Sequence, residues 1–447
     1  MIGKVAAIRR RKHGAEAPAE ASLARVAVAS CAGTTIEFYD FFVYGTAAAL
    51  VFPKVFFPAL GAVSGPLASF ATLGVAFVAR PVGALVCGHF GDRFGRKNIL
   101  VVTLLLMGVA TVLIGLLPSA ASIGPAAPIA LTVLRFLQGF AVGGEWAGAA
   151  LLAAEYAPER QRGRYAVFPQ LGPALGFILA SGTFLLVDVV IGAGSDAFLA
   201  YGWRIPFLSS AVLVLIGLYV RTAVAETPAF RRHQAELATA DARPAPAPVR
   251  VVLRTQWRQV LLGGGVLTVL FALFYVATAY LTSFGTSATG PGLSRATVLE
   301  LGIAAGVVLA LTTIAAGVLS DRFGRRRTII TGFVAAVPLV LVLFAWLGGG
   351  SGLAFGVTVA AMLGVYGIAY GPIGAYLPEL FATECRYTGA GIAYNLGGLL
   401  GGAVVPLAAA ALSAAYGVFA VGILVAAVAL VSLASAIALR SRAELLS

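Results

Sequence analysis

Five ionisable side chains lie inside long runs of apolar residues, where a charge is costly and marks a functional site by default. They are Glu37, Asp40, Arg80, Arg135 and Glu145. The spacing of three residues between Glu37 and Asp40 places both carboxyls on one face of a helix. At a rise of about 1.5 Å per residue, four of the five lie about 15–20 Å from one end of their run, near the middle of a bilayer. Arg135 lies further toward the outer side.

This set of side chains is suited to moving a proton together with an anion. A guanidinium group presents a planar fork that matches a carboxylate. Burial disfavours the charged form of a carboxyl group, whereas a nearby arginine favours it, so a balanced acid can take up and release a proton. We predict that Glu37, Asp40 and Glu145 carry the coupled proton and that Arg80 and Arg135 bind the substrate. The alternative is a set of salt bridges that only holds helices together, although three acids and two arginines give no one-to-one pairing.

The composition favours a lipid environment for these runs. Of the 447 residues, 60% are hydrophobic and only 11% are charged, whereas about 25% of the residues in a soluble protein are charged. A soluble fold of this size cannot bury so much apolar surface. The net charge of +13 would suggest nucleic acid as the partner of a soluble protein. Here the basic residues lie in short clusters between apolar runs, so the expected partners are the bilayer, a small-molecule metabolite and H+, with no nucleic acid.

Twelve apolar runs are long enough to cross a membrane as helices of about 20 residues. They are 27–51, 66–90, 98–117, 127–155, 165–191, 203–223, 258–284, 296–319, 328–347, 353–379, 387–412 and 415–439. Twelve spans place both termini on one side, and 26 of the 31 Lys and Arg residues fall on that side against 3 on the other. Cytoplasmic loops are rich in Lys and Arg, so we predict cytoplasmic termini in an inner (plasma) membrane.

The predicted fold class is an all-α polytopic membrane protein with twelve transmembrane helices in two pseudo-symmetric six-helix bundles. The longest cytoplasmic connection contains alternating prolines and divides the spans six and six. The predicted parts are an N-terminal tail (1–26), a first bundle (27–223), a connection (224–257), a second bundle (258–439) and a short C-terminal tail (440–447).

Equivalent loops of the two halves carry equivalent charges. The segment that begins Asp92-Arg93-Phe94-Gly95-Arg96 returns 229 residues later as Asp321-Arg322-Phe323-Gly324-Arg325, and a Glu/Arg pair after the fourth span returns after the tenth. Such a repeat is typical of transporters whose substrate site lies at mid-membrane between the halves. We predict that these loops form a conformational gate; the alternative is that their basic residues only fix the topology. The predicted gating residues are Gly88, Asp92, Arg93, Gly95, Arg96, Glu155, Arg162, Asp321, Arg322, Gly324, Arg325, Glu379 and Arg386.

Further polar and aromatic side chains are candidates for lining the substrate pocket. In the second half they are Tyr275, Tyr370, Tyr394 and Asn395, and in the first half Gln138 and Gln170 have a similar status. Tyrosines are also ordinary helix-packing and interface residues, so packing is the alternative role.

Several motifs resemble those of a known family. The segment 88–97 resembles the loop signature of the major facilitator superfamily, and 317–326 resembles its second copy. Segments 36–45, 56–58, 80–83, 135–146 and 378–389 resemble motifs of the metabolite:H+ symporter family. The resemblance implies alternating access and proton symport of carboxylates, aromatic acids or zwitterions, with the five buried charges in the coupling and binding site. Tyr39 and Tyr44, which lie in the first of these motifs, are added to the predicted substrate-binding residues.

We therefore expect a proton-coupled symporter that imports a small organic anion, most simply a carboxylate, and works as a monomer. The segment 172–176 partly resembles a motif of drug:proton antiporters, so a drug/proton efflux antiporter is one alternative. A zwitterion (proline or betaine) symporter and a non-transporting membrane sensor are the others. No nucleophile–base pair, metal-ligand cluster or phosphate loop indicates an enzyme. No cofactor is expected, since the proton gradient supplies the energy.

Overall fold

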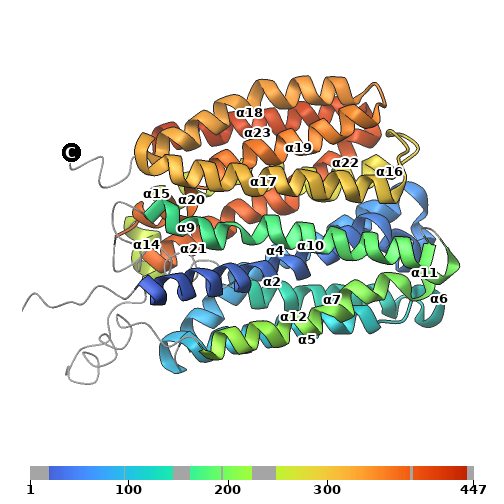
Figure 1. Ribbon diagram of the computed structural model, residues 1–447, viewed down its shortest axis with the longest axis horizontal. Helices are drawn as coiled ribbons and strands as arrows, with labels where there is room; N and C mark the ends of the chain where they lie inside the picture. The colour runs from blue at the N-terminus through green and yellow to red at the C-terminus, as the bar shows by residue number, and fades with distance from the viewer. Residues whose placement is uncertain are drawn as a thin grey trace, which may run out of the picture.

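The computed structural model describes residues 20–94, 96–143, 162–192, 195–223, 248–382 and 386–439, all of which form helices and their connections (Figure 1). Within these residues, nine helical segments are long and apolar enough to cross a membrane. Two shorter apolar helices, Val101–Leu116 and Ala126–Val142, lie among them. The predicted all-α membrane fold is confirmed.

The first bundle is built by the described helices up to residue 223. Its long helices are α2 (Glu20–Leu50), α4 (Gly61–Phe94), α5 (Arg96–Leu116), α7 (Ala126–Val142), α9 (Arg162–Gln170) with α10 (Gly172–Val187) and the π-helical turn η3 (Asp188–Gly192), and α12 (Ile205–Ala223). Short elements connect them: α3 (Phe52–Val55), η1 (Pro58–Leu60), α6 (Ala120–Ile123), α11 (Asp196–Ala200) and η4 (Gly202–Arg204).

The second bundle repeats the pattern with more interrupted helices. It contains α15 (Trp257–Tyr275) with the π-helical turn η5 (Val276–Tyr280) and α16 (Leu281–Thr286), then α17 (Arg295–Phe323), α18 (Arg325–Leu347), α19 (Gly352–Tyr370) with α20 (Ile373–Glu379), α21 (Arg386–Gly397) with η7 (Gly398–Val404) and α22 (Val405–Tyr416), and α23 (Val418–Ala438). Such π-helical turns are frequent at functional sites.

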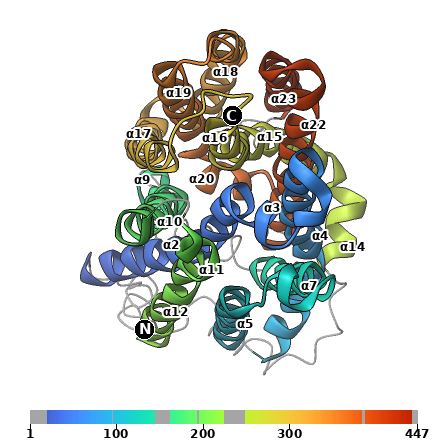
Figure 2. The same ribbon diagram turned by 90° about the vertical axis from the view of Figure 1, so that its right-hand side faces the viewer.

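The two groups of helices lie side by side, with their long axes roughly parallel (Figures 1 and 2). We call the end at which α2 and α9 begin the basal end, and the end that carries α3, α6, α11 and α16 the distal end. Large apolar side chains such as Val190, Leu215 and Leu353 are exposed on the outside of the bundles. In a bilayer these side chains face lipid, so close helix packing through small residues must hold the bundles together.

Two glycines show how close this packing is between α4 and α7. A Cβ atom at Gly83 would lie 1.9 Å from the carbonyl oxygen of Phe140, and one at Gly139 would lie 2.2 Å from that of Ala76. No side chain fits in either space. The contact brings the α4 and α7 arginines into one pocket.

The helices differ in detail from the predicted spans. α2 begins at Glu20, seven residues before the predicted run. The described end of the predicted connection forms a short helix, α14 (Pro248–Thr255), while residues 224–247 lie outside the described residues. The tenth predicted span is broken between α19 and α20, because Pro372 follows Gly371 and cannot donate the helical backbone bond.

Candidate transport site

A small pocket lies inside the first bundle. It is lined by four helices, α2, α4, α5 and α7, and its polar side chains are Glu37, Asp40, Arg80, Arg135 and Gln138. Each of the five is at most 6% exposed. The structure thus brings together four of the five predicted intramembrane charges; Glu145 lies outside the described residues.

Aromatic rings lie against both arginines of the pocket. The Arg135 guanidinium carbon lies 4.4 Å from the centre of the Phe41 ring and 3.9 Å from that of Tyr44. The Arg80 guanidinium carbon lies 4.5 Å from the Phe77 ring centre. A cation–π contact positions a cation without occupying its N–H groups. The Nε and Nη2 atoms of Arg135 and the Nε atom of Arg80 have no hydrogen-bond partner among the described residues.

Asp40 is held by hydroxyl groups from two other helices. Its Oδ2 accepts a hydrogen bond from Thr111 of α5 at 3.0 Å, and its Oδ1 accepts one from Ser210 of α12. Gln138 of α7 donates to the Thr111 hydroxyl at 2.7 Å, and Arg135 donates to the Gln138 carbonyl at 3.0 Å. Asp40 and Arg135 are therefore joined through two intermediate side chains. Thr111 and Ser210 could not be singled out from the sequence, since hydroxyl residues are common in membrane helices.

The predicted tyrosines of the second half lie in an aromatic layer between the bundles rather than in the pocket lining. The Tyr275 ring centre lies 5.1 Å from that of Phe41 and 5.2 Å from that of Phe77, so it contacts the rings that hold the arginines. The Tyr394 ring packs against the Phe271 ring with 5.0 Å between ring centres. The Tyr370 ring stacks on a neighbouring tyrosine ring of its own helix, with 4.7 Å between ring centres. The second bundle thus meets the pocket through aromatic rings.

Four other predicted binding residues make defined contacts outside the pocket. The Tyr39 hydroxyl donates to the Pro206 carbonyl at 3.0 Å, so it holds α2 against α12. The Tyr44 hydroxyl donates to Thr72 at 2.6 Å, and its ring holds Arg135. Two amides cross between the bundles: Gln170 donates to the Tyr370 carbonyl at 3.0 Å, and Asn395 donates to the Gly143 carbonyl at 3.4 Å.

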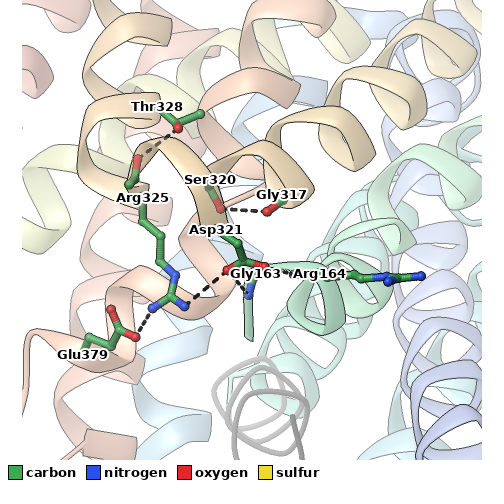
Figure 3. A network of polar contacts seen from close by, with 9 residues as sticks. Gly163, Arg164, Gly317, Ser320, Asp321, Arg325, Thr328 and Glu379 are labelled. Carbon is green, nitrogen blue, oxygen red and sulfur yellow. Dashed lines mark hydrogen bonds and ion pairs between the residues drawn. The ribbon is translucent and has the colours of Figure 1, made fainter. Parts of the chain in front are cut away.

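At the basal end, Asp321 at the end of α17 caps the start of α9 (Figure 3). Its two carboxylate oxygens accept the backbone N–H groups of Gly163 and Arg164, both at 3.0 Å. Arg325 lies 3.6 Å from the same carboxylate and also pairs with Glu379 of α20. The positive end of the α9 dipole favours this carboxylate. A Cβ at Gly163 would lie 2.6 Å from Asp321 Oδ1, so only glycine allows the contact.

The remaining predicted gating residues are placed only in part. Arg322 is exposed, Gly324 ends α17 with a φ of 92°, and Arg386 begins α21. Gly88, Asp92, Arg93 and Arg96 lie on the described backbone of α4 and α5, and Arg162 on that of α9, but their side chains are outside the described part of the chain. Gly95 and Glu155 lie outside the described residues altogether.

An ion pair at the distal end, absent from the sequence prediction, also joins the bundles. Arg295 at the start of α17 lies 3.4 Å from the buried carboxylate of Asp188 in η3, and its guanidinium carbon lies 4.3 Å from the Phe198 ring centre. Contacts between the bundles therefore exist on both sides of the pocket.

Two packed bundles of apolar helices, the first of which encloses a buried charged pocket, define a membrane transporter. The model of the "Sugar (and other) transporter" family matches residues 26–245 and 250–438, so the chain belongs to that family. The chain is 45% identical over 410 residues to the inner membrane metabolite transport protein YhjE of Escherichia coli (strain K12), covering 91% of each chain. It is 40% identical to the shikimate transporter of the same organism, covering 87% of each.

The fold matches that of a solved transporter. The crystal structure of a D-xylose-proton symporter superimposes with a TM-score of 0.72 at 18% identity, covering 92% of this chain and 96% of that one. The resemblance to the major facilitator superfamily drawn from the motifs is confirmed. The chain is a multi-pass membrane transporter and not an enzyme.

Proposed function

We propose that this transporter imports a small organic anion, most simply a carboxylate, together with a proton. The observation that carries the proposal is the buried Arg135 guanidinium, which is 1% exposed and has two nitrogen atoms without a hydrogen-bond partner in the described structure. A buried N–H without a partner costs about 1–3 kcal/mol. A carboxylate matches the planar fork of donors and removes that cost.

The charges of the described pocket supply the reason for proton coupling. Glu37 and Asp40 together balance Arg80 and Arg135, so the pocket is neutral when all four are ionised. A bound monoanion would leave an uncompensated charge in a buried site, which is expensive. One proton on Asp40 or Glu37 restores neutrality. Anion and proton therefore favour each other's binding, which is the requirement for symport.

The proposed orientation places the basal end and both termini in the cytoplasm of a cell with this protein in its inner membrane. The excess of Lys and Arg in the loops of that side supports it. Three exposed arginines, Arg250, Arg254 and Arg258, follow this pattern on α14 and the start of α15. One chain supplies the whole pocket lining, so we propose the monomer as the functional unit.

The proposed transport cycle uses the contacts between the bundles at the distal and basal ends. The distal ion pair opens first, the anion binds to Arg135 and Arg80, and Asp40 or Glu37 takes up a proton. The distal end then closes and the Asp321 cap at the basal end opens. The anion and the proton leave to the cytoplasm.

Reconstitution into liposomes tests the proposal. An inward proton gradient is imposed, and uptake of labelled shikimate, succinate, benzoate, proline and glycine betaine is measured. We expect uptake of a carboxylate that is abolished by a protonophore and by Arg135→Gln. Arg258→Gln, an exposed arginine at the start of α15, is the matched control and should retain uptake.

Other outcomes of this assay point to the alternatives. Preferential uptake of proline or betaine would contradict the anion assignment. Proton-driven export of a lipophilic cation, with no uptake of the panel, would indicate an antiporter. Uptake that survives the protonophore would disprove proton coupling.

A further inference from the structure

A chain of hydrogen bonds through Gln138 and Thr111 joins Arg135 to Asp40. We infer that Thr111 and Gln138 form a relay that couples the protonation of Asp40 to the anion affinity of Arg135, with Thr111 as the switching element. Neither residue is needed to carry the proton. This inference rests on the proposed function and specifies how the proton and anion sites communicate.

The Thr111 hydroxyl has one hydrogen and two acceptors within reach. Its oxygen lies 3.0 Å from Asp40 Oδ2 and 2.9 Å from the backbone carbonyl oxygen of Met107. It also accepts the Gln138 side-chain N–H at 2.7 Å. Thr111 is fully buried, so water does not compete for these bonds. The hydroxyl therefore has two discrete arrangements.

The protonation state of Asp40 selects between the two arrangements. When Asp40 is ionised, both of its oxygens are acceptors, and Thr111 donates to Oδ2 while Ser210 donates to Oδ1. When a proton binds at Oδ2, that oxygen becomes a donor toward the Thr111 oxygen. The Thr111 hydrogen then turns to the Met107 carbonyl. The Thr111 hydroxyl and the Asp40 carboxyl group keep their hydrogen bond to each other in both arrangements, because the hydroxyl oxygen has two lone pairs.

The change reaches Arg135 through Gln138. With Asp40 ionised, its charge polarises the chain of bonds from Arg135 through Gln138 and Thr111, and each bond strengthens the next. Protonation of Asp40 removes that charge, so the hydrogen bonds of the chain weaken. Less negative charge then compensates the Arg135 cation. The guanidinium then attracts a substrate carboxylate more strongly. The direct alternative is that the Asp40 charge acts on Arg135 through space alone.

Infrared titration of the purified, lipid-reconstituted protein separates the two routes without any substrate. The probe is the carbonyl stretching band of the protonated Asp40 carboxyl, assigned by its loss in Asp40→Asn. The other titratable groups that line the pocket are Glu37 of the same helix, Arg80 of α4 and Arg135 of α7. Their bands remain in Asp40→Asn and are subtracted.

The decisive variant is Gln138→Leu, because the Gln138 side chain bonds to Thr111 and Arg135 and reaches Asp40 only through Thr111. We expect it to raise the proton affinity of Asp40 at least about 5-fold, the lower range of measured couplings between sites. When Thr111→Val is already present, Gln138→Leu should not change the proton affinity of Asp40 further. When Thr111→Ser is present instead, Gln138→Leu should raise that affinity again, because serine keeps the hydroxyl. Thr111→Ala is measured in parallel in case the valine variant does not fold. Thr132→Val, whose hydroxyl bonds only to its own helix, is the matched control.

The results discriminate between the relay and its alternatives. An equal shift by Gln138→Leu in the presence and absence of the Thr111 hydroxyl would overturn the relay in favour of a through-space effect. No shift in either background would overturn any role of Gln138. Ser210→Ala removes the other bond to Asp40 without touching the relay, so the Gln138→Leu effect should persist there.

Transport provides a second readout. In liposomes that accumulate labelled shikimate, Thr111→Val should retain exchange of internal for external shikimate but lose gradient-driven accumulation. Loss of both in equal proportion would indicate a purely structural role. If the wild-type protein transports no compound of the panel, the proposed function fails, and the infrared titration still decides the relay.

Discussion

Replacing Asp321 by asparagine should weaken the contact that closes the basal end. The carboxylate accepts two backbone N–H groups of α9 at 3.0 Å and lies 3.6 Å from Arg325 (Figure 3). Asparagine is neutral and keeps one carbonyl oxygen. One of the two bonds is therefore lost, and the other no longer has a charged acceptor.

The magnitude follows from these contacts. A hydrogen bond to a charged group contributes about 1.5–3 kcal/mol and a neutral one about 0.5–1.5 kcal/mol. The Asp321 side chain is 14% exposed, so solvent screens part of the difference. We expect a loss of about 2 kcal/mol from each state in which the basal end is closed. This corresponds to a shift of about 30-fold in population toward states in which it is open.

Distance measurements between spin labels test this shift. Tyr219→Cys on α12 and Arg327→Cys on α18 place labels on exposed positions of the two bundles at the basal end, after the native cysteines have been replaced by serine. In Asp321→Asn the population with the longer distance should grow. The control is Asp196→Asn, the same change in the first turn of α11. The reasoning is refuted if Asp321→Asn and the control give the same distance distribution.

Three further changes and one control variant have defined outcomes. Asp188→Asn breaks the pair with Arg295 and should open the distal end, seen as faster labelling of an introduced distal cysteine by a membrane-impermeant thiol reagent. Gly163→Ala places a methyl group against the cap and should give the same spin-label shift as loss of the capping carboxylate. Gly139→Ala should destabilise the first bundle by about 1–3 kcal/mol through overpacking, lowering its thermal unfolding temperature. Gly45→Ala, where a Cβ meets nothing within 4 Å, should leave that temperature unchanged or raise it.

The fold and the position of the charged pocket could be predicted because both depend on strong local signals. Apolar runs of about 20 residues identify spans. Charges such as Asp40 and Arg135 are conspicuous inside them, and both line the pocket. The repeated loop also singled out Asp321, whose contact with α9 joins the bundles.

The partners of these residues could not be predicted, because they depend on which faces of distant helices meet. Thr111 lies 71 residues from Asp40, and Ser210 lies 170 residues from it. Asp188 lies at the end of its apolar run, where a charge is not conspicuous, and its partner is 107 residues away. Tyrosine is a residue type that can line a pocket, but helical spacing does not show that Tyr275 packs on Phe41.

All the residues that line the pocket belong to the first bundle, which limits how binding of a substrate can change the contacts between the bundles. A ligand shifts a conformational equilibrium only through contacts that differ between the states. The arginines belong to one bundle together with the whole pocket lining, so rocking of the bundles alone leaves their relation to a bound anion unchanged. Among the contacts between the bundles, the one next to the arginines is the packing of Tyr275 against Phe41 and Phe77, the rings that lie against those arginines, and rocking must alter it. On the proposed function, the first bundle supplies the affinity for the anion, and we expect the aromatic layer to convey its binding to the second bundle.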